Sequence, residues 1–156
     1  MTLKEFKFEK QEHDFKNFPE LTNGQMDRFY FQSPHKQITE DFVATVVKVI
    51  DGDTVRLETD FRDFTFPLRI AEIAAPELDE SGGIESQKWL AEKILGEEVE
   101  IKLTKGRVEK WGRLLGRILL FGMDIGEESR MNGKAVEWEA RKGLIQDHDK
   151  ELDKWE

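Results

Sequence analysis

The chain has no cysteine among its 156 residues. This absence excludes disulfides, thiolate zinc sites and cysteine nucleophiles. Its three histidines, His13, His35 and His148, are too far apart in the sequence to indicate a metal cluster. No apolar run approaches the ~18 to 20 residues that a membrane-spanning helix needs, and the charged start has no apolar signal-peptide region. We therefore expect a cytoplasmic protein, with a component of a virion or another assembly as the alternative.

Positive charge is also scarce, because the net charge is −9. An acidic chain is poorly suited to coating nucleic acid nonspecifically, since that mode needs many Lys and Arg side chains on phosphates. Residues 102–117 are the exception, with six basic side chains and one acidic. A solvated strand face is the simpler explanation of this basic stretch, and nucleic-acid binding is the sharper one. Its candidate binding residues are Lys102, Lys105, Arg107 and Lys110.

Residues 1–41 have the composition of an arm rather than of a folded domain. They contain seven Phe and Tyr residues, no Val, and few branched aliphatic residues. Pro19, Asn23-Gly24 and Pro34 interrupt the segment, so long helices or strands are not expected. Aromatic side chains without a core of their own dock on another surface, either on this domain or on a protein partner. We expect the barrel to fold without residues 1–38.

From residue 42 the pattern becomes that of a sheet. A β-branched run over 42–50 predicts the first strand. An Asp51-Gly52 turn, typical of hairpins, leads into a second strand over 54–59. A third strand follows over 64–71, where Pro67 marks an edge, a bulge or the effective start.

The second half of the domain alternates helix and strand. An apolar stripe from Ile84 to Leu95 predicts a helix that Gly96 ends. Strands over 98–103 and 114–121 and a short helix over 125–132 follow. This order indicates a mainly β (α+β) fold, a five-stranded OB-fold Greek-key barrel with two to three helices and an N-terminal arm. We place the domain at 42–143 and a short acidic C-terminal tail or helix at 144–156.

Four charged residues are candidates for chemistry: Asp53, Arg69, Glu77 and Arg113. Arg69 alternates with its apolar strand neighbours, so it points away from what they bury. A surface ion pair is the simpler explanation for each residue alone. Together, two arginines and two carboxylates from separate elements would form a site if they converge at one end of a small barrel.

Three motifs occur in order: Val49-Ile50-Asp51-Gly52-Asp53-Thr54-Val55, then Arg69 followed by Ala75-Pro76-Glu77, then Glu109-Lys110-Trp111-Gly112-Arg113. Together they closely resemble the staphylococcal nuclease (thermonuclease) family over about residues 42–136. The resemblance implies the OB barrel and an endonuclease that hydrolyses DNA and RNA with one Ca²⁺, with Mn²⁺ or Mg²⁺ less favoured. It also implies roles for single residues. Asp53 and the Ala75 backbone carbonyl would bind the metal, Glu77 would position or deprotonate water, and Arg69 and Arg113 would clamp the phosphate.

The metal site departs from that family at Ala74, where an aspartate usually supplies a second ligand. Ca²⁺ takes about six to eight oxygens, and its affinity follows the number of charged ligands. One direct carboxylate should therefore hold it poorly. Asp51 or Glu72 could substitute, although Glu72 lies a two-residue strand step, about 6.6 Å, from Ala74.

Two further departures concern the second helix and the base-binding side chains. Ser129 and Arg130 stand where the family carries apolar residues, so that helix should pack differently. The tyrosines that usually stack on the base are absent. Trp138 could stack instead, although a docked tryptophan is the simpler explanation.

These observations leave two hypotheses open. The first is a metal-dependent nuclease that cuts DNA or RNA, weakened by the loss at Ala74, and the four charged candidates favour it. The second is a catalytically silent module of the same fold that binds nucleic acid or serves in an assembly, with residues 1–41 docked on a protein partner. Ala74, the acidic charge and the aromatic arm favour the second.

Overall fold

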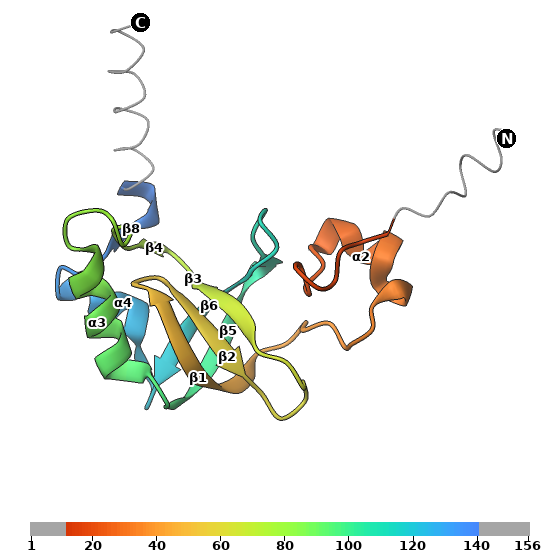
Figure 1. The fold of residues 1–156 in the computed structure, drawn as a ribbon, viewed down its shortest axis with the longest axis horizontal. Helices are drawn as coiled ribbons and strands as arrows, with labels where there is room; N and C mark the ends of the chain where they lie inside the picture. The colour runs from red at the N-terminus through yellow and green to blue at the C-terminus, as the bar shows by residue number, and fades with distance from the viewer. Residues whose placement is uncertain (1–11, 141–156) are drawn as a thin grey trace, which may run out of the picture.

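The computed structural model describes residues 12–140, and Figure 1 shows a small barrel with helices at one side and the N-terminal arm at the other. The barrel region contains β1 (Phe42–Asp51), β2 (Thr54–Glu58), β3 (Phe66–Ile70), β4 (Ile73–Ala74), α3 (Gly83–Ile94), β5 (Glu98–Val108), β6 (Leu114–Leu120), β7 (Met123–Asp124), α4 (Ile125–Met131) and β8 (Val136–Glu137). The arm contains α2 (Asn23–Phe29) and the 3₁₀ helix η1 (Tyr30–Gln32). Within residues 12–140, no helix is long and apolar enough to cross a membrane.

Five strands close into a barrel. They are ordered β3-β2-β1-β5-β6 with antiparallel neighbours, and β3 then pairs in parallel with β6. Leu68 lies opposite Leu114 in this closing ladder, which begins one residue after Pro67. Pro67 therefore lies near the effective start of β3, where its missing N–H costs no bond to β6. The predicted OB-type barrel is confirmed.

Helix α3 covers one end of the barrel with only part of the predicted apolar stripe. Leu90 and Ile94 are fully buried, whereas Ile84 and Leu95 are about half exposed, so that part of the predicted stripe is wrong. The helix also buries its small residues Gly83 and Ser86. A Cβ on Gly83 would lie 1.9 Å from the carbonyl oxygen of Glu77, so a glycine is required for this close approach.

The β1–β2 turn is one residue later than predicted. Asp51 pairs with Thr54, which makes Gly52 and Asp53 the two turn residues. A Cβ on Gly52 would come within 2.0 Å of the Ser86 hydroxyl oxygen on α3. The glycine is therefore required by the helix that packs over the turn, and the turn and the helix are fixed to each other.

Helix α4 packs with small and polar residues, as its sequence predicts. Ile125, Gly126 and Ser129 are its buried residues. Ser129 is 1% exposed although it is polar. Arg130 stays at the surface and pairs with Glu127 one turn earlier. The helix therefore seals the barrel through one large aliphatic side chain.

The described part of the arm docks on the barrel of its own chain. Leu21 and Ile38 are buried, and Ile38 belongs to the main hydrophobic core. Glu20 is almost fully buried and forms ion pairs with Arg62 and Arg107 of the barrel. Phe6 and Phe8, and the predicted tail at 144–156, lie outside the described residues.

The Glu20 cluster explains why the arm is attached. The Arg62 guanidinium lies 4.9 Å and 4.7 Å from the ring centroids of Phe64 and Phe66. Burial lowers the pKa of Arg62 and of Arg107, and the nearby Glu20 carboxylate opposes that shift. Removing the arm would leave two buried cations without their carboxylate. This packing opposes the expectation that the barrel folds without residues 1–38.

We predict that Glu20→Ala destabilises the protein by about 3 to 5 kcal/mol, because it leaves buried charge uncompensated. Thermal and urea unfolding measure the effect. Glu40→Ala is the matched control, since Glu40 is an exposed arm carboxylate, and its unfolding should match wild type. Equal stability of the two variants would show that the buried cluster does not hold the arm.

Candidate active site

The turn between β1 and β2 places Asp53 beside Arg69. The Ile70 amide donates to the Asp53 carbonyl oxygen at 2.8 Å, which ties the turn to the end of β3. The Asp53 carboxylate accepts a hydrogen bond from the Ala75 amide at 2.9 Å. The same Asp53 carboxylate oxygen lies 3.4 Å from a guanidinium nitrogen of Arg69. Asp53 and Arg69 are each 9% exposed, so this pair is shielded from bulk solvent.

Thr54 links this pair to Arg113. Its hydroxyl donates to the Asp53 carboxylate at 3.0 Å and accepts from Arg113 at 3.3 Å. Glu109 holds the other side of the Arg113 guanidinium through two hydrogen bonds of 2.6 and 3.1 Å. Those bonds raise the pKa of Arg113 above its ordinary value, with smaller contributions from Asp53 and Asp51. The structure thus joins three of the four predicted charged residues in one network.

The fourth residue, Glu77, is exposed and lies just beyond β4. Its negative charge affects the nearby carboxyl group of Asp51. Asp51 is half-buried, and its pKa is raised to about 6 by burial, by the side chain of Asp53 and by the charge of Glu77. Asp51 also accepts a hydrogen bond from the Asp53 amide at 3.0 Å. Three carboxylates therefore crowd the same end of the barrel.

A hollow of about 370 Å³ opens beside the arginine network. Arg69, Leu115, Trp111 and Trp138 are among the residues that line it. Trp111 is 64% and Trp138 44% exposed, and the Arg69 guanidinium lies 5.6 Å from the Trp138 ring centroid. Two accessible indole rings and a buried arginine thus line the same hollow.

Comparisons with known proteins agree with this geometry. The chain is 34% identical over 76 residues to micrococcal nuclease of Shigella flexneri. The match takes in 49% of this chain and 41% of that protein, so the chain spans less than half the length of this curated relative. No family model matches the chain.

The chain is thus similar to a nuclease over about half of its length, which agrees with the resemblance that the three motifs carry. Arg69, Asp53 and Arg113 lie together in the barrel although long stretches of sequence separate them.

The residues at this site fit a divalent cation only in part. Asp51 and Asp53 offer carboxylates, and Ala75, whose amide donates to Asp53, lies beside them. Ala74 contributes only a buried methyl group. Both Asp53 oxygens already accept hydrogen bonds from the protein. In the described part of the chain, no group of three or more His, Cys, Asp or Glu side chains has the arrangement of a metal site. The donors therefore suit weak binding better than a complete Ca²⁺ shell.

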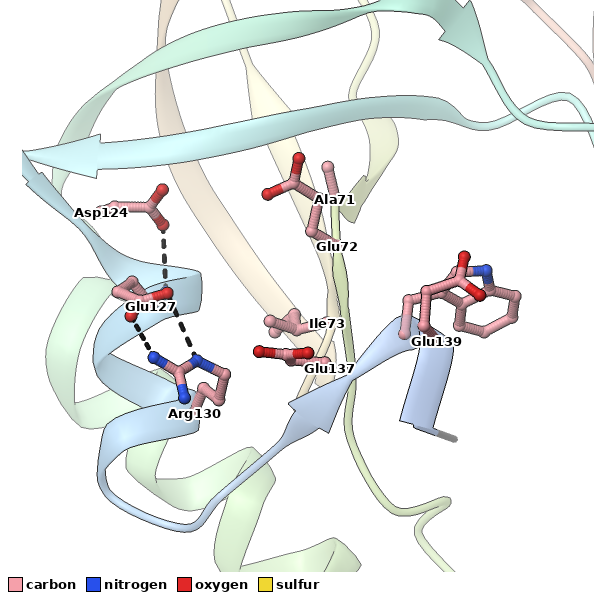
Figure 2. Close-up of a pocket in the computed structure, with 9 residues that line it drawn as sticks. Ala71, Glu72, Ile73, Asp124, Glu127, Arg130, Glu137 and Glu139 are labelled. Atoms are coloured by element: carbon pink, nitrogen blue, oxygen red, sulfur yellow. Dashed lines mark hydrogen bonds and ion pairs between the residues drawn. The ribbon is translucent and has the colours of Figure 1, made fainter. Parts of the chain in front are cut away.

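Glu72, the other candidate to replace the missing aspartate, lines both the hollow beside the arginine network and a second hollow. Its carboxylate pairs with Arg117 at 2.5 Å. This second, acidic hollow has a volume of about 420 Å³. Figure 2 shows the carboxylates that line it, which belong to Glu72, Asp124, Glu127, Glu137 and Glu139. Asp51 adjoins Asp53, so Asp51 is the better placed substitute of the two.

The basic residues predicted to bind nucleic acid lie in different environments. Lys105 and Lys110 are exposed, and the Lys110 ammonium lies 5.0 Å from the Trp111 ring centroid. The Lys102 ammonium lies 3.7 Å from the Asp41 carboxylate, and both side chains are half exposed. Arg107 is 7% exposed and points into the arm, so the structure does not present it to a phosphate. The accessible part of the basic stretch is therefore smaller than the charge count predicts.

Sequence reasoning missed Thr54, Glu109 and Trp111 as site residues. Thr54 is within the first motif, and Glu109 and Trp111 are within the third. Their position next to the predicted charged residues was the available signal. Thr54 bridges Asp53 to Arg113, Glu109 aims that arginine, and Trp111 borders the hollow.

We predict that Asp51→Asn stabilises the cation-free protein above pH 7. Because folding raises the pKa of Asp51, its ionised form is less favourable in the folded than in the unfolded protein, and wild-type stability falls as the pH rises through about 6. The gain should be about 1 kcal/mol at pH 8, since solvent screens a half-buried carboxylate, and should vanish below pH 4. Urea unfolding in EDTA at pH 4 and pH 8 measures it. A gain that does not change with pH would contradict the charge crowding.

Proposed function

We propose that the domain hydrolyses phosphodiester bonds in DNA or RNA, as a nuclease whose divalent-cation site is weakened at Ala74. The observation that carries the proposal is the network joining Arg69 and Arg113 through Asp53 and Thr54. A purely structural barrel has no need to hold two arginines against one partly buried carboxylate. The micrococcal nuclease match supports the same reaction class.

The two arginines bind the oxygens of the scissile phosphate. A guanidinium carries five N–H donors in a planar fork that matches phosphate oxygens and stays charged at all working pH values. Arg113 directs three hydrogen bonds to Glu109 and Thr54. Its pairing with Glu109 orients the fork before substrate arrives, and such preorganised charge stabilises a transition state most effectively.

Glu77 is the base for the attacking water. It is exposed, and its charge reaches Asp51. As the water oxygen bonds to phosphorus, Glu77 takes the water proton. The bond to the leaving oxygen breaks, and that oxygen takes a proton from solvent. A carboxylate within reach of the water is suited to this step.

Asp51 and Asp53, with the Ala75 carbonyl, are the residues that would hold a divalent cation, Ca²⁺ in the first place. A bound cation would supply charge stabilisation at the phosphate oxygens. Its nearest effect on the chain would be to offset the repulsion that raises the pKa of Asp51.

Trp138 and Trp111 bind the nucleotide next to the cleaved bond. Base stacking on an aromatic ring contributes about 1 to 3 kcal/mol per base and tolerates any sequence. The hollow between them opens beside Arg69, so a base stacked there would bring its phosphate toward the arginines. Lys105 and Lys110 add weak electrostatic contacts along the strand.

A second candidate function is nucleic-acid binding without cleavage, or service as an assembly subunit. The observation that favours it is the saturated Asp53 carboxylate, whose oxygens face the Ala75 amide, the Thr54 hydroxyl and Arg69. With Ala74 in place of an acid, such a site can bind a phosphate through its arginines while holding a cation poorly.

We predict that Arg113→Ala lowers the rate of single-stranded DNA cleavage in Ca²⁺ by on the order of 100-fold or more, because it removes a transition-state donor. Arg117→Ala is the matched control, since Arg117 lies on β6, directly after the loop that carries Arg113, and pairs with Glu72 in the acidic hollow. Circular dichroism should show both variants folded. Full cleavage by Arg113→Ala would refute the assigned site, and no cleavage by wild type would favour the binding module.

We predict that Ala74→Asp increases Ca²⁺-dependent cleavage and makes folding more dependent on Ca²⁺. Ala74 is 4% exposed, so a new carboxylate there adds repulsion that only a cation offsets. Ala74→Asn, which has the same shape without charge, should gain neither property. Thermal unfolding and cleavage in Ca²⁺ and in EDTA measure both effects. Strong cleavage by wild type with no gain from the aspartate would contradict the weakened-site argument.

A further inference from the structure

The N-terminal arm touches the loop that carries Arg113. In Figure 1 the arm lies beside the hairpin formed by β5 and β6, on the side of the barrel away from α3 and α4. One contact is between Phe18 and Gly112. A Cβ added to Gly112 would lie 2.7 Å from a ring carbon of Phe18, so the ring rests directly on the loop backbone. Gly112 has φ +86°, a conformation that favours glycine.

A second contact fixes the strand that leads into this loop. The Arg107 guanidinium donates to the Ile38 carbonyl at 2.6 and 2.9 Å, to the Leu21 carbonyl at 3.2 Å and to the Asn23 side chain at 2.8 Å. Arg107 lies in a β-bulge with φ +64°, a conformation uncommon for residues with a side chain. Such a backbone persists where surrounding contacts determine it, and here those contacts come from the arm.

A third contact lies two residues earlier on β5. The side-chain amide of Asn23 donates to the Lys105 carbonyl at 3.3 Å. The arm therefore holds the hairpin at Lys105 and Arg107 on the β5 side and at Gly112 on the β6 side. Between these contacts a hollow of about 440 Å³ separates the arm from Trp111.

The loop geometry in turn sets the position of Arg113. The Gly112 amide donates to the Glu109 carbonyl at 2.9 Å, and the Glu109 amide donates to the Arg113 carbonyl at 2.9 Å. The same loop places the Glu109 carboxylate against the Arg113 guanidinium at 2.6 Å. A shift of the Gly112 backbone would therefore move both the arginine and the carboxylate that aims it.

We propose that residues 13–23 brace the 109–113 loop in cis, with Phe18 as a positioning residue that keeps Arg113 aimed at the substrate phosphate. The catalytic consequence of this brace rests on the nuclease function proposed above, whereas its mechanical part does not. Phe18 is 43% exposed, so it adds little to the buried core. Its ring contacts the loop and lies 6.5 Å from the His13 ring within the arm, so removing it should loosen the loop more than it weakens the fold.

The experiment compares Phe18→Ala with Phe31→Ala in the full chain. Phe31 is also an arm aromatic but is 95% exposed. Amide hydrogen exchange followed by NMR reports loop opening at Glu109 and Gly112, and Ile70, bonded to the Asp53 carbonyl, reports the barrel. We expect exchange at Glu109 and Gly112 to rise about tenfold in Phe18→Ala, with Ile70 unchanged, since local opening is separable from global unfolding. Phe31→Ala should match wild type, and Phe18→Tyr, which keeps the ring, should restore protection.

Unchanged exchange at Glu109 and Gly112 in Phe18→Ala would overturn the brace, whatever the cleavage rate. A parallel rise at Ile70 would also overturn it, because Phe18 would then act on global stability. Cleavage is measured separately: we expect a lower kcat with little change in KM for Phe18→Ala. A wild-type protein that does not cut would remove the nuclease proposal, and the exchange data would still decide the brace.

Discussion

The parallel pairing of β3 with β6 is the constraint on which the site depends. In an open sheet ordered β3-β2-β1-β5-β6, Arg69 and Arg113 would lie on opposite edges. Closure puts Leu68 opposite Leu114 and Arg69 opposite Leu115, so Arg113, the residue just before β6, lies where the ladder with β3 begins. The β1–β2 turn ends at the same place, because Thr54 pairs with Arg69. The ladder thus brings Arg69 to the Asp53 carboxylate and Arg113 to the Thr54 hydroxyl that donates to the same carboxylate.

Buried charge is balanced differently in the two parts of the barrel. Under the arm, Glu20 faces Arg62 and Arg107, and backbone carbonyls take the remaining positive charge. At the site the excess has the opposite sign, and Asp51 responds with a raised pKa. A desolvated cation pair needs acceptors, whereas crowded carboxylates need a cation or protons. The protein's own groups therefore oppose the buried charge at the first end, whereas the carboxylates at the second end remain crowded.

The sequence was sufficient for the strand order and for the charged set, because both follow from local patterns. Alternating apolar residues predict each strand, and motif order points to Asp53, Arg69 and Arg113. It was insufficient where tertiary contacts override periodicity. Ile84 lies on the apolar stripe of α3 but is exposed, since Gly52 and Gly83 let other faces approach closely. The burial of Arg107 could not be predicted either, because only the docked arm explains why a cation in a basic stretch is buried.

Ala74 acquires a physical meaning from this charge distribution. Its methyl group is buried where β4 pairs with β8, close along the chain to the Ala75 amide that binds Asp53. A carboxylate there would add a fourth negative group to a cluster that already raises the pKa of Asp51. Alanine avoids that repulsion, and the protein's own donors satisfy Asp53 instead. On the proposed function, the same residue would stabilise the cation-free fold and weaken cation binding, and the two effects would be inseparable at this position.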